Sequence, residues 1–180
     1  MTLKDMKLRV LSLIEEVNPE SEYLTDDIDI QAKINYVIDT KNHELARIKK
    51  IAASDKIEVS EGDEKNLYDE LSDFYKLKNI IGVKYDLFDS IVTFKEDGEA
   101  KIQYYKYPKL INADTEDEYK FELSTDALEI MPYGIAADLL KSDVSAQYGK
   151  IYAEAYQQAL QMLDIKTAEG SIEIIGGIDG

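Results

Sequence analysis

The sequence contains no cysteine and no tryptophan, and His43 is the only histidine among its 180 residues. Without cysteine, the chain cannot form a disulfide framework, a thiolate metal site or a cysteine nucleophile. A single histidine leaves little material for a histidine-rich metal site or for a Ser-His-Asp triad. We therefore expect neither a cofactor nor a bound metal.

Long apolar runs are also missing. The longest uncharged, mostly apolar stretch covers residues 130–137, which is too short to span a bilayer. The N-terminus lacks the basic-then-apolar order of a signal peptide, because Glu15 and Glu16 closely follow Leu13 and Ile14. The sequence therefore predicts a soluble intracellular protein that does not contact a membrane.

Basic residues are scarce, with 21 against 37 acidic ones, and the net charge is -16. Arg9 and Arg47 are the only arginines, so arginine clamps for phosphate or carboxylate groups are few. Such a charge repels DNA phosphates and anionic membranes. Excess carboxylate also keeps a small domain soluble, so the charge by itself leaves both a specific role and simple solubility open.

Apolar residues at helical spacing predict two long helices at the start of the chain. The first covers residues 3–17 and ends at Asn18-Pro19, and the second begins at residues 25–27 and continues to Ile51. A short connection between them predicts a helical hairpin.

The middle of the chain alternates short apolar runs with turn residues. Strands are predicted for residues 56–59, 80–85, 91–95, 102–107 and 119–123, and residues 65–78 are ambiguous between helix and loop. Helical spacing then returns: Thr125 or Asp126 caps a short segment, Pro132 fits the first turn of a helix ending at Leu140, and a last helix covers residues 145–163.

These elements together predict an α+β fold that is mainly α, a helical bundle of about four helices with an inserted small antiparallel β segment and an extended C-terminal tail. We expect one domain over residues 1–165, consisting of a helical hairpin (1–55), a β-containing insertion (56–124) and C-terminal helices (125–165), followed by a flexible or strand-forming tail (166–180).

Tyrosines and a tail strand are the candidate interaction residues. Tyr104, Tyr105 and Tyr107 share one predicted strand, and the adjacent Tyr104 and Tyr105 point to opposite faces, so that one of them can be exposed. In the tail, an apolar strand lies between glycines. It can fold onto the chain's own sheet, add to the sheet edge of a neighbour, or remain disordered. Its candidate contact residues are Ile172, Ile174 and Ile175.

The remaining polar clusters do not form a recognisable catalytic motif. We expect His43 to be a solvated helix residue beside Asp39 and Arg47. The acidic runs at residues 26–29 and 114–118 lack EF-hand spacing and are better explained as a helix N-terminus and a solvated loop. No P-loop and no Gly-x-Ser-x-Gly motif occurs in the sequence. We expect a protein that is not an enzyme.

Three segments resemble the head–tail connector (adaptor, or head-completion) proteins of tailed phages. Residues 127–143, which contain Met131-Pro132-Tyr133 and two consecutive leucines, resemble the family's "(L/M)-P-Y-x-x-A-x-x-L-L-x-x-D" segment. Residues 71–77, Leu-Ser-Asp-Phe-Tyr-Lys-Leu, are similar to its "L-P-x-D-F-Y-K-L" segment, with Ser72 where proline is usual. The Tyr-Lys-Tyr-Pro of residues 105–108 resembles the motif that closes the family's β segment.

This resemblance implies a structural protein of the virion, located at the head–tail interface of a phage or prophage. It would form a ring of its own copies on the portal protein, contact a tail or stopper protein, and extend a channel through which DNA passes without sequence-specific binding. The alternative is an acidic module that binds or inhibits a nucleic-acid-binding partner. A metal-dependent hydrolase that uses an acidic cluster is a third hypothesis.

Overall fold

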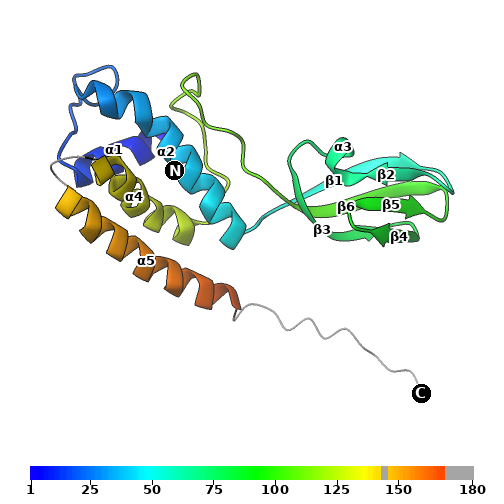
Figure 1. The fold of residues 1–180 in the computed structure, drawn as a ribbon. Coiled ribbons are helices and arrows are strands. Elements are labelled where there is room, and N and C mark those ends of the chain that lie inside the picture. Colours follow the sequence, from blue (N-terminus) through cyan, green and yellow to red (C-terminus); the bar gives the residue numbers. More distant parts are fainter. Residues whose placement is uncertain (143–145, 169–180) are drawn as a thin grey trace.

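The computed structural model describes residues 1–142 and 146–168, which form two bodies joined by a narrow neck (Figure 1). The helical body contains α1, α2, the connection of residues 107–124, α4, η1 and α5. The β body covers residues 51–106.

The elements of the helical body are α1 (Leu3–Leu13), α2 (Ile28–Ile48), α4 (Thr125–Leu139), η1 (Leu140–Ser142) and α5 (Ala146–Ala168). Those of the β body are β1 (Ile51–Val59), β2 (Glu64–Asn66), α3 (Leu67–Glu70), β3 (Phe74–Ile81), β4 (Tyr85–Phe88), β5 (Ile91–Phe94) and β6 (Gly98–Lys106).

Helix α1 is shorter than its sequence predicts. It begins at a capping box, in which the Thr2 hydroxyl accepts from the Asp5 N–H at 3.2 Å and the Asp5 carboxylate accepts from the Thr2 N–H at 2.8 Å. It ends at Leu13 because Glu15 adopts a φ of 61° and the Glu16 N–H donates to the Leu11 carbonyl at 2.9 Å. The apolar residues up to Val17 therefore continue the predicted stripe without continuing the helix.

The start of α2 agrees with the sequence prediction. The Asp27 carboxylate accepts from the N–H groups of Asp29 and Ile30, at 2.8 and 3.0 Å, as expected for an acidic helix N-terminus. Its end differs: the chain leaves the helix after Ile48 and enters β1 at Ile51, five residues before the predicted strand.

Helix α4 is the central helix of its body and packs against α1, α2 and α5. Pro132 lies inside this single helix rather than in a first turn, and it is buried together with Met131, Gly134 and Ile135. A proline in a helix interior costs a hydrogen bond and strains the preceding turn. The burial of α4 on three sides offsets that cost, so the predicted break between a short segment and a second helix does not occur.

The β body consists of two antiparallel sheets of three strands, with the orders β1-β6-β3 and β2-β5-β4. Gly82, at φ 105°, ends β3 and divides the single strand predicted over residues 80–85 into β3 and β4. The two sheets enclose their own apolar cluster, which consists of Val59, Leu67, Leu71, Phe74, Ile80, Val83, Val92, Phe94, Ala100, Ile102 and Tyr104.

The prediction of a mainly helical four-helix bundle is therefore wrong. Over residues 1–142 and 146–168, the structure has five α-helices and two three-stranded antiparallel sheets, with 44% helix and 25% strand, and is a mixed α/β fold. The strands of the β body have a core that is separate from the helical core around Leu3, Met6, Ile38 and Met131. The segment predicted as a small insertion is a second folded body, because its strands bury a core of their own.

The chain returns from the β body through residues 107–124, which run beside α2 (Figure 1). The strand predicted over residues 119–123 does not form, and this segment contributes only an isolated bridge between Thr2 and Lys120. The last helix continues to Ala168, beyond its predicted end at residue 163.

Candidate interaction site

The three candidate tyrosines, two in β6 and Tyr107 directly after it, contribute to the β core and the neck. Tyr104 is buried, and its hydroxyl donates to Asp73 Oδ1 at 3.0 Å. Burial, together with this carboxylate, raises the pKa of Tyr104 to about 12. Tyr105 is half-buried, with the Lys50 ammonium 5.2 Å from its ring centroid.

Tyr107 lies where the two bodies meet. Its ring is 5.0 Å from that of Tyr75 in β3 and 6.3 Å from the imidazole of His43 in α2. Its N–H donates to the Asp73 carbonyl at 2.8 Å. The neck is thus built by packing between side chains of both bodies, and these tyrosines are engaged within the protein.

His43 shows no arrangement typical of a metal ligand. Its Nδ1 lies 3.0 Å from the Asp39 carbonyl and 3.4 Å from Asp39 Oδ1, within the same helix. Across residues 1–142 and 146–168, no group of three or more His, Asp and Glu side chains is placed to hold a metal ion. The remaining candidates, Ile172, Ile174 and Ile175, lie outside the described residues.

The acidic run at residues 114–118 forms one side of a groove on the helical body. The groove lies between α2, the loop of residues 22–24 and the connection of residues 110–118, and has a volume of about 880 Å³. Three large side chains that line it are exposed: Tyr36 (74%), Leu110 (67%) and Tyr23 (59%). We call it the α2 groove.

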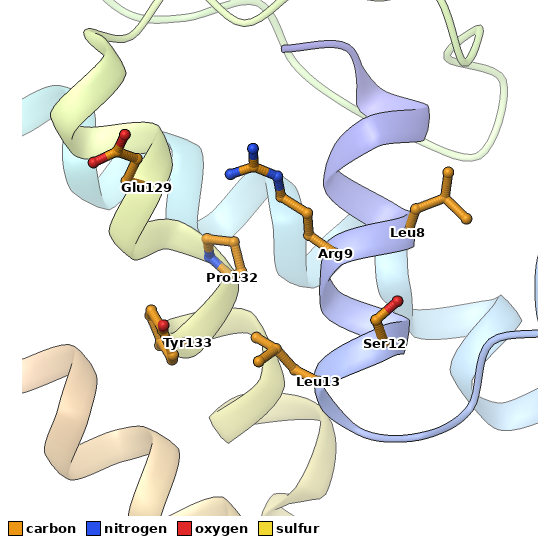
Figure 2. Close-up of a pocket in the computed structure, with 7 residues that line it drawn as sticks. All are labelled: Leu8, Arg9, Ser12, Leu13, Glu129, Pro132 and Tyr133. Carbon is orange, nitrogen blue, oxygen red and sulfur yellow. The ribbon is translucent and has the colours of Figure 1, made fainter.

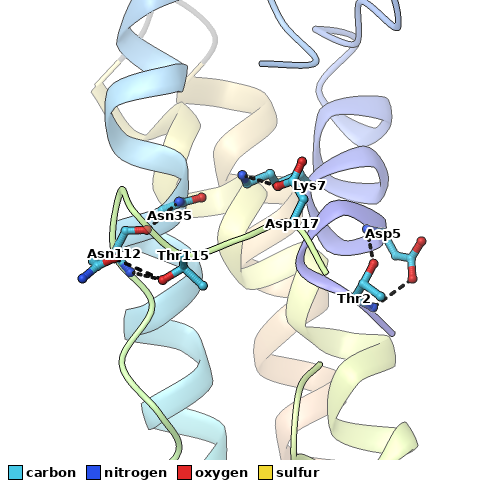
Figure 3. Close-up of polar contacts among 7 residues, drawn as sticks. All are labelled: Thr2, Asp5, Lys7, Asn35, Asn112, Thr115 and Asp117. Atoms are coloured by element: carbon cyan, nitrogen blue, oxygen red, sulfur yellow. Dashed lines mark hydrogen bonds and ion pairs between the residues drawn. The ribbon is translucent and has the colours of Figure 1, made fainter. Parts of the chain in front are cut away.

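Contacts from two helices, α2 and α1, hold the wall of the α2 groove in place (Figure 3). The Asn35 amide donates to the Asn112 carbonyl at 2.7 Å, and Asp39 Oδ1 accepts from the Ile111 N–H at 2.8 Å. From α1, Lys7 forms an ion pair with Asp117 at 2.8 Å. Sequence reasoning treated this segment as a solvated loop and missed the groove. The available signal was Tyr36, an aromatic residue outside the apolar stripe of its helix.

A second groove lies between α1 and α4 and has a volume of about 420 Å³ (Figure 2). Leu13 and Pro132 supply apolar walls, and the Arg9 guanidinium extends from α1 toward α4. Tyr133, from the motif that resembles the connector family, lines the same groove and is 38% exposed. This motif therefore contributes both to the core and to an accessible surface.

Comparison with known protein families and with curated proteins gives no match for this sequence. Within the described part of the chain, no helix is both long enough and apolar enough to cross a membrane.

Proposed function

We propose that this protein is a structural connector at the head–tail interface of a tailed phage or prophage. In this role it forms a ring on the portal protein, contacts a tail or stopper protein, and extends the channel for DNA. The proposal rests on the resemblance of three short segments, and it assigns no catalytic activity to the chain.

The observation that carries the proposal is the meeting of two of these segments in the neck. Asp73 and Tyr75 come from the segment at residues 71–77, and Tyr107 comes from the segment at residues 105–108. Tyr107 contacts both, through a 2.8 Å hydrogen bond to the Asp73 carbonyl and a ring separation of 5.0 Å from Tyr75. The two segments thus meet at the end of the β body that faces α2, where the Tyr107 ring lies 6.3 Å from that of His43.

The charge of the chain supports the same role. A channel through which DNA slides must not hold phosphates tightly, and a protein of net charge -16 repels them on average. Two bodies joined by a neck also provide separate surfaces, one for ring neighbours and one for a partner ring.

A decisive experiment removes the gene from an inducible prophage that carries it. We expect DNA-filled heads and free tails that do not join, and addition of the purified protein to the lysate should restore infectious particles. Joined, infectious particles without the gene would overturn the proposal. Mixing the protein with the portal protein of the same genome, followed by native mass measurement and imaging, then tests for a stacked ring.

The acidic rim of the α2 groove favours a second candidate, an acidic module that occupies the basic surface of a nucleic-acid-binding protein. Carboxylates of Glu22, Glu116 and Glu118 line this groove. Capture of DNA-processing proteins, with no portal or tail protein, would favour this candidate over the connector.

A further inference from the structure

The α2 groove has the features of a docking site for part of another protein. Two large side chains that line it are exposed to solvent, Tyr36 at 74% and Leu110 at 67%. These residues come from α2 and from the connection of residues 107–124, which lie far apart in the sequence. Because both side chains line one groove, they offer a partner two apolar contacts in the same place, which differs from single exposed residues scattered over a protein.

The groove is formed before any partner binds. Hydrogen bonds of 2.7 and 2.8 Å tie the connection to Asn35 and Asp39 of α2. The backbone of the connection is also tied to α1, where the Lys4 N–H donates to the Asp117 carbonyl at 3.0 Å. A partner would therefore not have to order this wall, which removes one entropic cost of binding.

The charge around the groove identifies the kind of partner. Glu22, Glu116 and Glu118 are exposed on its rim. Lys7 also lines the groove, but its ammonium is engaged with Asp117 at 2.8 Å. The rim therefore attracts cations, and it repels nucleic acid as well as a second copy of this acidic chain.

A hydrogen-bond acceptor in the groove wall also lacks a partner. Asn35 Nδ2 donates to the Asn112 carbonyl, whereas Oδ1 of the same side chain is buried and has no hydrogen-bond partner within the described residues. A buried acceptor without a partner is costly, so the wall of the groove holds an unsatisfied polar atom.

We propose that the α2 groove binds a segment of a different protein in which lysine or arginine residues flank a large aliphatic side chain. The aliphatic group packs against Tyr36 and Leu110, and the cations pair with the rim carboxylates. This inference depends on the proposed function in one respect. If the protein is a connector, the bound segment belongs to the portal or to the tail-side protein.

The test uses the full chain and a fluorescent 12-residue peptide with leucines between lysines and arginines. Two matched peptides replace either the leucines by serine or the basic residues by glutamate. We expect the first peptide to bind and both matched peptides to bind at least tenfold more weakly. The affinity should also fall as salt rises, because the rim charges are exposed. No binding of the first peptide would overturn the inference.

Variants locate the binding site. Tyr36→Ser combined with Leu110→Ser should weaken binding at least tenfold, since both side chains are mostly exposed and their loss leaves the core intact. Glu116→Gln with Glu118→Gln should weaken it severalfold, whereas the control Glu58→Gln with Glu61→Gln makes the same charge change in the β body and should have no effect. Equal weakening by both glutamine pairs would show non-specific attraction to net charge and overturn the inference.

The two proposals can fail separately. If the Tyr36→Ser, Leu110→Ser variant still restores head–tail joining in the lysate, the connector role stands and the α2 groove has no part in it. If the peptide binds in the groove but the gene is dispensable for joining, the docking site stands and the connector role fails.

Discussion

The helical body and the β body reach stability by different routes. In the β body, short turns join most strands that follow one another in the chain, but the strands paired in a sheet are mostly not consecutive, since β6 lies between β1 and β3. The two sheets close over a core to which Phe74, Phe94 and Ile102 contribute. In the helical body, α4 packs against α1 and α2, which lie far from it in the chain, and against α5, which is the next α-helix. Long connections, residues 14–27 and 107–124, link α1 to α2 and the β body to α4. Both long connections line the α2 groove, so the body that has them carries this candidate interaction surface.

Polar contacts show the same contrast. In the helical body, Lys41 joins three helices: it pairs with Glu44 at 2.9 Å and with Asp138 of α4 at 3.1 Å, and lies 5.1 Å from the Tyr156 ring centroid in α5. Lys56 in the β body pairs with Glu99 across two strands that are already held by backbone hydrogen bonds. In the helical body, this charged group therefore helps to position three helices. In the β body, the ion pair is added to strands that backbone hydrogen bonds already hold together.

The strongest test of this comparison is a pair of glycine substitutions, one in each body. A Cβ on Gly82 would lie 2.5 Å from the Glu99 carbonyl oxygen at a φ of 105°, and a Cβ on Gly134 would lie 2.9 Å from the Tyr156 ring. We expect Gly82→Ala to destabilise the β body by about 3 kcal/mol and Gly134→Ala to destabilise the helical body by about 1–3 kcal/mol. NMR spectra recorded during thermal unfolding can follow each body separately.

The control is Gly149→Ala in α5, where the nearest contact of the added Cβ is 3.3 Å. Alanine stabilises a helix interior relative to glycine by up to about 1 kcal/mol, and this gain opposes the tight contact with Leu140. Gly149→Ala should therefore change stability less than Gly134→Ala does. If Gly82→Ala and Gly134→Ala lower one common transition by similar amounts, the two bodies unfold as a single unit and the comparison fails.

The next largest effect should come from Lys41. Its side chain is only 12% exposed, and replacement by methionine removes a cation from between two carboxylates. Burial disfavours the charged ammonium, but hydrogen bonds to Glu44 and Asp138 outweigh it, so the pKa of Lys41 is raised. We expect Lys41→Met to cost the helical body about 1–3 kcal/mol in urea unfolding.

A double-mutant cycle with Asp138→Asn measures the coupling directly. If Lys41→Met and the double variant are as stable as the unmodified protein, the network does not position the helices, and the contrast between the bodies then reduces to chain topology.

Local sequence signals predicted the elements whose ends are fixed locally. The Asp27 cap marks the start of α2, because a carboxylate needs only the next few N–H groups to act. Ile51 shows the limit: it continues the apolar spacing of Ile48, yet it pairs with Lys106 on β6. Pro132 shows the same limit. A local rule places proline in the first turn of a helix, whereas tertiary burial keeps Pro132 inside α4.

The candidate site was predictable only in part. Tyr104, Tyr105 and Tyr107 were recognised as a group, but their roles in the β core and the neck depend on Asp73, Lys50 and His43, which lie elsewhere in the sequence. The α2 groove combines three separate segments, and the spacing of residues within any one segment does not reveal it.

The two bodies should also differ, by a smaller amount, in how their stability falls at alkaline pH. The pKa of Tyr104 rises from 10.0 to about 12 on folding, so between these values the folded β body keeps a proton that the unfolded chain loses. This contribution is complete below pH 10 and disappears as pH rises through 12, with a slope of about 1.4 kcal/mol per pH unit in between. Tyr104→Phe should flatten the pH dependence of the β body alone.

The helical body provides the internal control for this titration. Burial raises the pKa values of Tyr119 and Tyr156 there as well, so its stability should still fall in alkali in the Tyr104→Phe variant. If the β body of that variant loses stability with the original slope, another group is responsible for its alkaline unfolding.

The smallest expected effect concerns the Lys56–Glu99 pair in the β body. Its two side chains are 60% and 50% exposed and lie 2.7 Å apart. Water screens exposed pairs, and such contacts typically contribute about 0–1 kcal/mol. Glu99→Gln should therefore leave the urea-unfolding midpoint of the β body nearly unchanged, and added salt should abolish any difference. A loss comparable to that of Lys41→Met would show that charge positions the strands of the β body as it positions the helices, and the proposed difference between the two bodies would then be wrong.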